Sequence, residues 1–307
     1  MKKLLIIGGT GHVGLSLINK LSLNKNLYLT IITRNKLNKK CDQNINYILV
    51  EDYLDQIKIY NEIKNKKFDI LVNLVTAGSN RGIILESSYI NYINVDFANY
   101  VSSIAIKLGV SKIITFGTLE EYQGINKIPW DESSSLSPEL PYPKSKIKIN
   151  NDLIKLCKAN SINYFHLRLA SIYGVGESSN RFIPKLLEAA ISRTTLKISK
   201  INIIRNYLHI DDCIDWIISI ILTEYSLNLI DTINFSSDKS HSNGEIINIL
   251  NDISGDLIDY KENEYPLWLM DEKPIIPSSI KRKEYGFIEK INIFYGMKQL
   301  FEYYKSK

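Results

Sequence analysis

The chain has 307 residues, enough for one large domain or two smaller ones with a well-buried core. Hydrophobic residues make up 45% of it and charged residues 23%, as in ordinary soluble globular proteins. The net charge is +5 and the lysines are scattered, so the composition gives no footprint of a nucleic-acid-binding protein. The opening segment "MKKLLII" imitates a signal peptide, but its apolar run is too short for export or for a membrane span, and we expect a cytoplasmic protein.

The first 170 residues alternate strand-like and helix-like segments. Runs rich in apolar and β-branched residues predict strands at residues 3–8, 27–33, 45–50, 69–75, 112–117 and 163–170. Longer segments with a helical pattern lie between them, at residues 12–24, 54–65, 87–108 and 143–159. Several of the strands are apolar throughout, which is typical of strands covered on both faces. The order predicts an α/β fold, a doubly wound parallel sheet of the Rossmann type.

After residue 170 the rhythm changes. A Gly/Ser-rich loop at 171–182 precedes a helix at 183–193 and a short strand at 195–198. The apolar segment in "YLHIDDCIDWIISIILTEY" predicts a further helix, with Asp211 or Asp212 as its N-terminal cap.

These changes predict two regions. Residues 1–170 would form the Rossmann domain, and residues 171–307 would form mainly a smaller C-terminal lobe. A strand and a helix at 204–223 are expected to return to the first domain.

The glycine-rich segment "GGTGHVG" joins the first predicted strand to the first predicted helix. Gly9, Gly11 and Gly14 have the G-x-G-x-x-G spacing, and Gly8 extends the pattern. Glycine is needed where the chain turns sharply and where a pyrophosphate approaches the backbone at a helix N-terminus. We predict a dinucleotide-binding loop with contacts from Gly8, Thr10, Gly11, His12, Val13 and Gly14.

The ends of the second and third strands indicate which dinucleotide is bound. A carboxylate about 20 residues after the glycines would bind the ribose hydroxyls of NAD. Here the strand ends in Thr33, Arg34 and Asn35, and Arg34 can pair with a 2′-phosphate, assisted by Lys36. NADP(H) is therefore favoured over NAD(H). The alternative for Arg34 is a solvated arginine in a basic loop. Asp52 is a candidate partner of the adenine amino group, or else a turn aspartate.

A candidate catalytic pair lies in "YPKSK". A hydride reaction on a carbonyl or alcohol needs a group that gives or takes a proton. Tyr142 can serve if a nearby cation lowers its pKa, and a helix beginning near Pro143 would place Lys146 one turn away. Thr118 stands at the carboxyl end of a predicted strand, where open α/β sheets bind their ligands. We expect Thr118 to hold the substrate oxygen while Tyr142 exchanges its proton.

With these motifs the chain resembles the extended short-chain dehydrogenase/reductase family, the epimerases, dehydratases and ketoreductases that act on nucleotide sugars. The resemblance covers almost the whole chain, through "GGTGHVG", "VED", "NLVTAG", "INVDFANYVSSIA", "TFGTLEEY", "YPKSK", "LRLASIYGVG" and "RNYLHIDD". It implies catalytic roles for Thr118, Tyr142 and Lys146, with Lys146 contacting the nicotinamide ribose. It implies further cofactor contacts from Tyr53, Leu74, Val75, Thr76, Ala170 and Ile172. Nucleotide-sugar contacts are implied for Thr118, Glu120, Asn180, Arg181 and Arg205, although Arg181 and Arg205 could instead form surface ion pairs.

Three departures from the family's patterns narrow the reaction. Related 4,6-dehydratases have an Asp-Glu pair after the Ser/Thr, whereas Leu119 stands here before Glu120, so the acid for the leaving hydroxyl is absent. Epimerase-reductases similar to GDP-fucose synthase have a cysteine at the position of Glu120, which leaves Glu120 open as a base or a positioning residue. Arg34 indicates exchangeable NADPH, whereas 4-epimerases and dehydratases recycle a tightly held NAD.

We therefore predict NADPH-dependent reduction of the 4-keto group of a nucleotide-diphosphate 4-keto-6-deoxy sugar, a step of deoxysugar biosynthesis. The alternatives are an NAD(P)-dependent nucleotide-sugar epimerase and, from another class, a non-catalytic dinucleotide-sensing regulator. The resemblance also implies a homodimer, formed through the helices at 87–108 and 143–159. The four histidines and three cysteines have no metal-ligand spacing, so no metal site is predicted.

Overall fold

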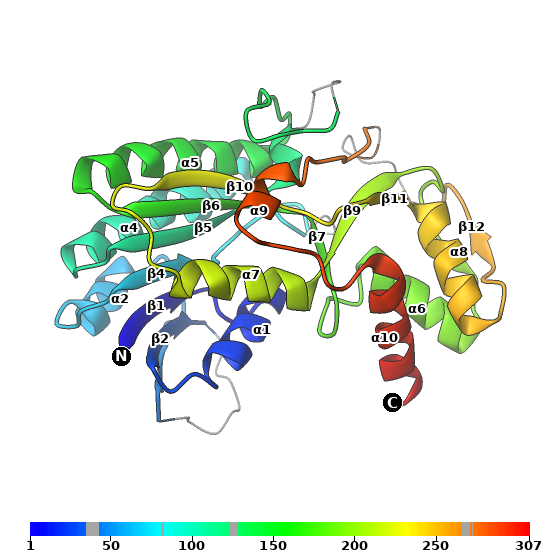
Figure 1. Ribbon diagram of the computed structural model, residues 1–307, viewed down its shortest axis with the longest axis horizontal. Coiled ribbons are helices and arrows are strands. Elements are labelled where there is room, and N and C mark those ends of the chain that lie inside the picture. Colours follow the sequence, from blue (N-terminus) through cyan, green and yellow to red (C-terminus); the bar gives the residue numbers. More distant parts are fainter. Residues whose placement is uncertain (35–42, 81–82, 123–127, 266–270, 272) are drawn as a thin grey trace. The chain divides into compact units, whose positions relative to one another are not determined.

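The computed structural model describes residues 1–34, 43–80, 83–122, 128–265, 271 and 273–307. The chain divides into two compact units, which can be followed by colour in Figure 1. The first comprises Met1–Glu121, Pro138–Arg168 and Ile214–Ile233, and the second comprises Tyr122–Ser137, Leu169–Cys213 and Asn234–Lys307. The division near Arg168 is close to the expected boundary at residue 170, but residues 122–137 belong to the second unit.

A seven-stranded sheet forms the centre of the first unit. Its strands are β1 (Lys2–Ile7), β2 (Leu27–Thr33), β3 (Ile45–Leu49), β4 (Ile70–Asn73), β5 (Lys112–Thr118), β6 (Asn163–Leu169) and β10 (Ile230–Phe235). They lie in the order β10-β6-β5-β4-β1-β2-β3, which is that of a doubly wound fold with one strand added. The pairs β1–β2, β2–β3, β1–β4 and β4–β5 are parallel. The predicted fold class is confirmed, while β10 was not expected from the sequence.

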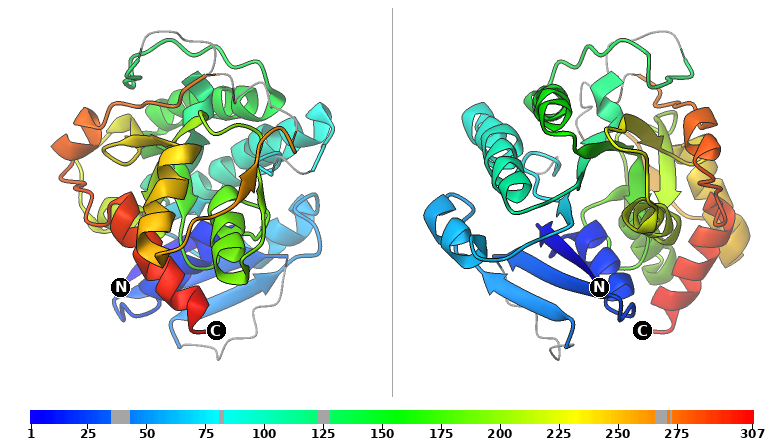
Figure 2. Two further views of the ribbon diagram at one scale, coloured as in Figure 1. Left: turned by 90° about the vertical axis from the view of Figure 1, so that its right-hand side faces the viewer. Right: turned by 60° about the vertical axis from the view of Figure 1, so that its left-hand side comes forward.

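Helices cover both faces of this sheet (Figure 2). They are α1 (His12–Leu21), α2 (Gln56–Ile63), α3 (Ser87–Asn91), α4 (Ala98–Lys107), α5 (Pro141–Asn160) and α7 (Ile210–Leu222). The segment predicted as one helix at 87–108 contains a π-helical turn, η1 (Tyr92–Phe97), between α3 and α4. A short 3₁₀ turn, η2 (Leu119–Tyr122), follows β5.

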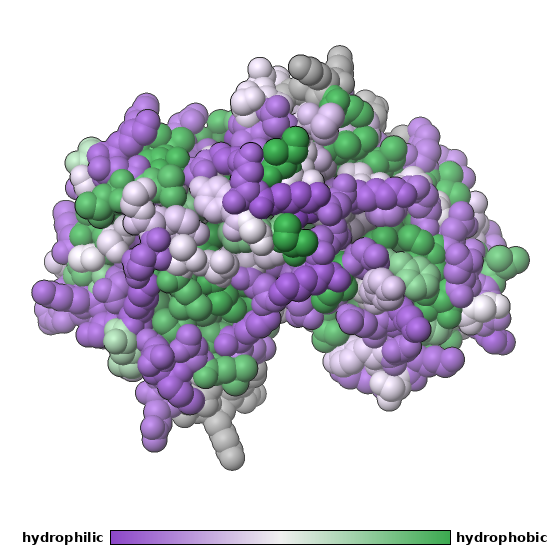
Figure 3. All heavy atoms as spheres, viewed as in Figure 1, coloured by the Kyte–Doolittle hydropathy of each residue, from purple (hydrophilic) through white to green (hydrophobic). Residues whose placement is uncertain are grey.

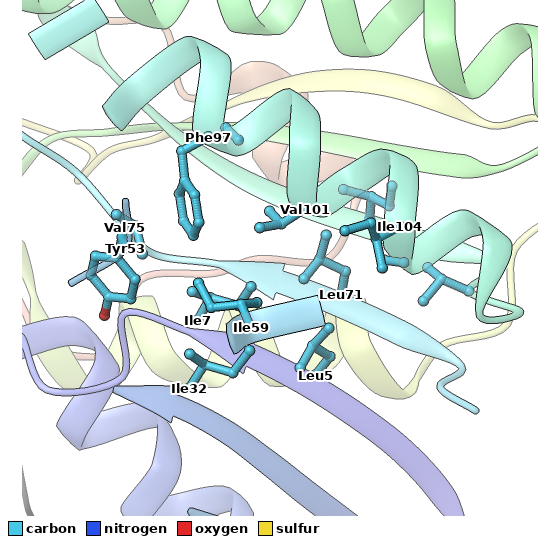
Figure 4. Close-up of a cluster of buried hydrophobic side chains, with 14 of the residues drawn as sticks. Leu5, Ile7, Ile32, Tyr53, Ile59, Leu71, Val75, Phe97, Val101 and Ile104 are labelled. Atoms are coloured by element: carbon cyan, nitrogen blue, oxygen red, sulfur yellow. The ribbon is translucent and has the colours of Figure 1, made fainter. Parts of the chain in front are cut away.

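The apolar strands lack a two-residue alternation because both of their faces are buried. Leu4, Leu5, Ile6 and Ile7 in β1 are all fully buried. Figure 4 shows part of the cluster on one face, where side chains of β1, β2 and β4 meet those of α2, η1 and α4. Each large apolar side chain buried in this way contributes about 1.5–3 kcal/mol, so the cluster fixes the strand ends that carry the candidate site.

The second unit contains a three-stranded sheet, in the order β11-β9-β7, and a two-stranded one. Its strands are β7 (Ser171–Tyr173), β8 (Leu196–Lys197), β9 (Ile204–His209), β11 (Ser240–Ser242) and β12 (Tyr260–Lys261). Its helices are α6 (Phe182–Ser192), α8 (Asn243–Ser254), α9 (Ile280–Glu284) and α10 (Ile293–Lys305). A hydrophobic cluster joins α6, α8 and α10 to β8 and β9.

Two expectations about residues 204–223 need correction. Strand β9 pairs with β7 and β11 in the sheet of the second unit, and only the part of α7 from Ile214 onward belongs to the first. Asp211 and Asp212 lie in the first turn of α7 rather than at its cap. Asp212 is buried and accepts hydrogen bonds from the main-chain N–H groups of Lys290 (3.0 Å) and Ile291 (2.9 Å). It therefore anchors the segment before α10.

Figure 3 shows one face of the molecule coloured by hydropathy. Hydrophilic residues cover much of this face, with smaller hydrophobic areas between them. Within the described ranges, each helix is too short or too polar to span a bilayer.

Candidate active site

The glycine-rich loop follows β1 and is packed closely on its inner side. Gly8 has φ +82°, and a Cβ there would lie 2.7 Å from the main-chain nitrogen of Val75. A Cβ on Gly14 would lie 2.8 Å from the backbone of Gly9, so α1 can approach the loop only without a side chain at that position. A Cβ on Gly11, in contrast, would meet no atom within 4 Å. The loop thus leaves the exposed backbone at Gly11 open to a ligand.

Helix α1 begins directly after this loop, at His12. Its N-cap is Gly11 in an extended conformation, which provides no side-chain cap, and its first turn contains no acidic residue. The first N–H groups of a helix have no partner within the helix and carry a partial positive charge. The N-terminus of α1, which includes Val13 and Gly14, therefore fits a phosphate group.

Arg34 follows β2 and lies over the ring of Tyr53, with its guanidinium carbon 5.2 Å from the ring centroid. Tyr53 is buried and packs against Phe97, the ring centroids being 5.3 Å apart. Burial raises the pKa of Tyr53, and this is partly offset by the charge of Arg34 and by a backbone hydrogen bond from Gly8. This stacking holds an exposed cation beside the start of the glycine-rich loop.

The other predicted cofactor contacts of the first unit lie at strand ends. Thr33 ends β2, and Leu74, Val75 and Thr76 follow β4 directly. Because parallel strands end at the same edge of the sheet, these residues share the edge with the glycine-rich loop. The Oδ1 of Asp52 accepts a hydrogen bond from the N–H of Leu54 (3.0 Å), as in a turn aspartate. Asn35 and Lys36 lie outside the described residues.

Tyr142 lies in the first turn of α5, and Lys146 follows one turn later. The Nζ of Lys146 is 5.7 Å from the centroid of the Tyr142 ring. Lys146 is buried, and burial lowers its pKa to about 8, an effect opposed by the charge of Glu121. A cation held near the tyrosine favours the phenolate form of Tyr142. The loop after β4 packs closely against this turn, since a Cβ on Gly78 would lie 3.3 Å from the Cβ of Tyr142.

Thr118 is the last residue of β5 and is largely buried. Its Oγ1 accepts a hydrogen bond from the N–H of Glu120 (3.2 Å), which leaves the hydroxyl hydrogen able to point to another oxygen. The N–H of Thr118 donates to Oε1 of Glu121 (3.0 Å). Glu120 itself is half-buried at the surface of this turn.

Asn94 and Ser145 were not predicted from the sequence as residues of the site. Asn94 lies in the π-helical turn, where its amide pairs with both the N–H (2.8 Å) and the C=O (2.9 Å) of Ala77. Its Nδ2 also donates to the hydroxyl of Ser145 (2.9 Å), which donates in turn to the carbonyl of Tyr142 (2.6 Å). Asn94 thus joins the loop after β4 to the first turn of α5. The sequence indicates Asn94 only as a polar residue inside an apolar helical segment. A polar group that is buried in such a segment needs a hydrogen-bond partner.

Five predicted contact residues belong to the second unit: Ala170, Ile172, Asn180, Arg181 and Arg205. Asn180 is exposed, and the Nε of Arg181 lies 3.7 Å from Oε1 of Glu177. Arg205 is buried, forms an ion pair with Asp271, and donates to the carbonyl of Ile204 (2.8 Å). In this structure Arg205 therefore forms an ion pair, which was the alternative to a nucleotide-sugar contact, although the pair is buried and does not lie at the surface.

The sequence from residue 4 to residue 230 matches the model of the NAD dependent epimerase/dehydratase family. The chain belongs to this family. Its sequence is 23% identical to a UDP-glucose 4-epimerase from Lactobacillus helveticus over 283 residues, which cover 84% of this chain and 83% of the relative.

Solved structures of two epimerases and a dehydratase have the same fold. A UDP-glucose 4-epimerase from Thermotoga maritima with UDP-glucose superposes with a TM-score of 0.83 at 20% identity, covering 99% of both chains. A UDP-N-acetylglucosamine 4-epimerase from Methanobrevibacter ruminantium, bound to UDP-N-acetylmuramic acid, gives 0.85 at 20% identity over 99% of this chain and 98% of that one. A dTDP-glucose 4,6-dehydratase from Bacillus anthracis, in complex with NAD, gives a TM-score of 0.82 at 17% identity, covering 100% of this chain and 97% of that one.

Membership of the NAD dependent epimerase/dehydratase family implies a nicotinamide dinucleotide as cofactor. The first unit fits such a group: Gly11 leaves the backbone open, and the N-terminus of α1 has no side-chain cap. At the end of β2, the described residue after Thr33 is Arg34, a cation rather than a carboxylate. The site therefore fits a dinucleotide, and the end of β2 carries a positive charge.

Proposed function

We propose that the chain catalyses hydride-transfer chemistry at C4 of a nucleotide-diphosphate sugar, with Tyr142 as the proton-exchanging group. The observation that carries this proposal is the pairing of Tyr142 with the buried Lys146, whose Nζ lies 5.7 Å from the tyrosine ring. A pKa of about 8 leaves Lys146 mainly charged at neutral pH. A permanent role as regulator would not require this arrangement of a tyrosine and a buried cation.

Each residue of the site has a distinct part in this reaction. A bound nicotinamide supplies or accepts the hydride. The hydroxyl of Tyr142 gives its proton to the sugar oxygen during reduction, and the ammonium group of Lys146 stabilises the phenolate that remains. The hydroxyl of Thr118 donates a hydrogen bond to the same oxygen. Asn94 and Ser145 hold the first turn of α5, and with it Tyr142, against the loop after β4.

The finer proposal is NADPH-dependent reduction of a 4-keto-6-deoxy sugar. Arg34, stacked on Tyr53, is suited to pair with the 2′-phosphate of NADPH. Leu119 supports a reaction without dehydration, because it is buried and apolar at the position where an acid would protonate a leaving hydroxyl. Reduction then needs only the hydride donor and the proton of Tyr142.

A second candidate is a 4-epimerase, because the chain is similar to several 4-epimerases in sequence and in fold. In that reaction Tyr142 would first take the proton of the C4 hydroxyl and later return it to the 4-keto oxygen. The same residues serve both reactions, so the difference lies in the cofactor and in the substrate supplied.

Turnover of defined substrates by the purified protein tests both proposals. NADPH oxidation would be followed with dTDP-4-keto-6-deoxyglucose and its UDP and GDP counterparts, and C4 epimers would be sought after incubation with UDP-glucose and UDP-N-acetylglucosamine. Tyr142→Phe keeps the ring and removes only the hydroxyl, so we expect it to lower kcat by about 100-fold or more. Turnover that survives this change would refute the role of Tyr142. Stoichiometric NAD⁺ that resists dialysis, with epimer formation, would favour the epimerase over the reductase.

A further inference from the structure

Arg34 and Tyr53 follow two neighbouring strands of the large sheet. Strands β2 and β3 are parallel, and the N–H of Val50, directly after β3, donates to the C=O of Thr33, the last residue of β2 (3.0 Å). Beyond this hydrogen bond the chain continues from one strand to Arg34 and from the other to Tyr53. The two side chains therefore meet at the edge of the sheet that carries the glycine-rich loop.

The ring of Tyr53 is fixed in the fold. The turn that carries it leads into α2, where the side chain of Asp55 caps the helix by accepting the N–H of Lys58 (2.9 Å). Only 5% of Tyr53 is exposed, and its ring packs against the fully buried ring of Phe97, with 5.3 Å between the centroids. Figure 4 shows both residues in the hydrophobic cluster. Tyr53 is thus a rigid aromatic surface beneath whatever lies on its outer face.

Arg34 lies on that face and is exposed. An exposed arginine has many rotamers to choose from, and a ligand that binds it must fix one of them. Here the guanidinium carbon is 5.2 Å from the centroid of the Tyr53 ring, within the range of a cation–π contact. An aromatic ring, unlike a carboxylate, holds the guanidinium without neutralising it, so its charge stays available to a phosphate. A side chain that is already held loses less conformational freedom when the ligand binds.

We infer that Tyr53 is a positioning residue for cofactor specificity, whose ring holds the guanidinium of Arg34 in place for the 2′-phosphate of NADPH. The preference for NADPH over NADH then depends on the ring of Tyr53 as well as on the charge of Arg34. This inference rests on the NADPH dependence in the proposed function. Any contact of Tyr53 with the rest of the dinucleotide is common to both cofactors, so the ratio of their affinities isolates the action through Arg34.

Fluorescence titration of the full-length protein with NADPH and with NADH, without a nucleotide sugar, gives this ratio. Tyr53→Leu removes the ring and keeps an apolar side chain, and we expect the preference for NADPH to fall by about 2- to 5-fold, the effect of one cation–π contact at an exposed site. Tyr53→Phe is the matched control, because it keeps the ring and removes only the hydroxyl, and its preference should equal that of the wild type. Tyr53→Met, which is closer in length to tyrosine, replaces Tyr53→Leu if the latter does not fold.

A double-mutant cycle shows whether Tyr53 acts through Arg34. In an Arg34→Gln background the guanidinium is gone, so Tyr53→Leu should leave the ratio of affinities unchanged. The inference is overturned if the folded Tyr53 variants keep the wild-type preference, if Tyr53→Phe loses as much as Tyr53→Leu, or if Tyr53→Leu has the same effect in both backgrounds.

Failure of the proposed function has different signatures. A wild type that binds the two dinucleotides equally, or a preference that Arg34→Gln leaves intact, would refute the NADPH assignment and this inference together. Loss of the preference in Arg34→Gln but not in Tyr53→Leu would refute this inference alone. Turnover that survives Tyr142→Phe would refute the catalytic proposal and leave the binding measurements unaffected.

Discussion

Asn94 is the residue whose replacement should reveal how the helix carrying Tyr142 is held in place. It is almost completely buried in the π-helical turn and makes three hydrogen bonds, two to Ala77 and one to Ser145. In Asn94→Ala, the N–H and C=O of Ala77 lose their partner inside the protein. Each buried group left unpaired costs about 1–3 kcal/mol, so the loss of both partners should lower the free energy of unfolding by about 2–6 kcal/mol.

Asn99→Ala is the matched control for this experiment, since it makes the same substitution in the following helix, α4. The Nδ2 of Asn99 donates to Oδ2 of Asp152 (3.0 Å) in a partly buried position, and water can replace that partner. The loss there should stay below about 1 kcal/mol. Urea denaturation followed by circular dichroism would measure both variants. Equal losses in the two variants, or a loss below 1 kcal/mol in Asn94→Ala, would refute the reasoning about Ala77.

Two further predictions concern the cofactor and the pH dependence of stability. Arg34→Asp should weaken NADPH binding by about 10- to 100-fold, because the 2′-phosphate loses a charged hydrogen-bonding partner. NADH has no 2′-phosphate, so its binding should change much less. Fluorescence titration measures both affinities, and equal effects on the two would contradict the role of Arg34. The pKa of Glu121 is about 2 in the folded protein, against its ordinary value of 4.5, so its contribution to stability is complete above pH 4.5 and is lost as the pH falls towards 2. The urea midpoint of the wild type should therefore fall more steeply between pH 5 and pH 3 than that of Glu121→Gln, and parallel curves would contradict this assignment.

Much of the fold followed from local sequence patterns. The first six strands could be predicted because their apolar runs are separated by helical segments of ordinary length. Strand β10 was missed because its sequence, "IDTINF", has two adjacent polar residues that break the alternation of a half-buried strand, and it has none of the continuous apolar character of its neighbours. The place of β9 in the second unit depends on pairing with β7 and β11, strands of three residues each, which give almost no signal of their own.

The candidate site was predictable where it depends on spacing and not where it depends on distant partners. Tyr142 and Lys146 are one helical turn apart, and the glycines of the loop follow one another, so the sequence alone places them together. Glu121, in contrast, is one of two adjacent glutamates. Its burial follows from Arg168 in β6, 47 positions along the chain. The sequence pointed to Glu120, the half-buried member of the pair, as the candidate for a role in the reaction.

A perturbed pKa does not by itself identify the active site of this protein, because two buried lysines of the first unit share it. Burial lowers the pKa of both Lys112 and Lys146 to about 8. The Nζ of Lys112, at the start of β5, donates to the carbonyls of Ile220 (2.8 Å), Ile221 (3.2 Å) and Thr223 (2.7 Å). It therefore caps the C-terminus of α7, a structural role. Lys146 instead lies over the Tyr142 ring, and the charge of Glu121 raises its pKa. Glu121 follows the other end of β5, after Thr118. The partners of each lysine, and not its burial, decide which one belongs to the chemistry.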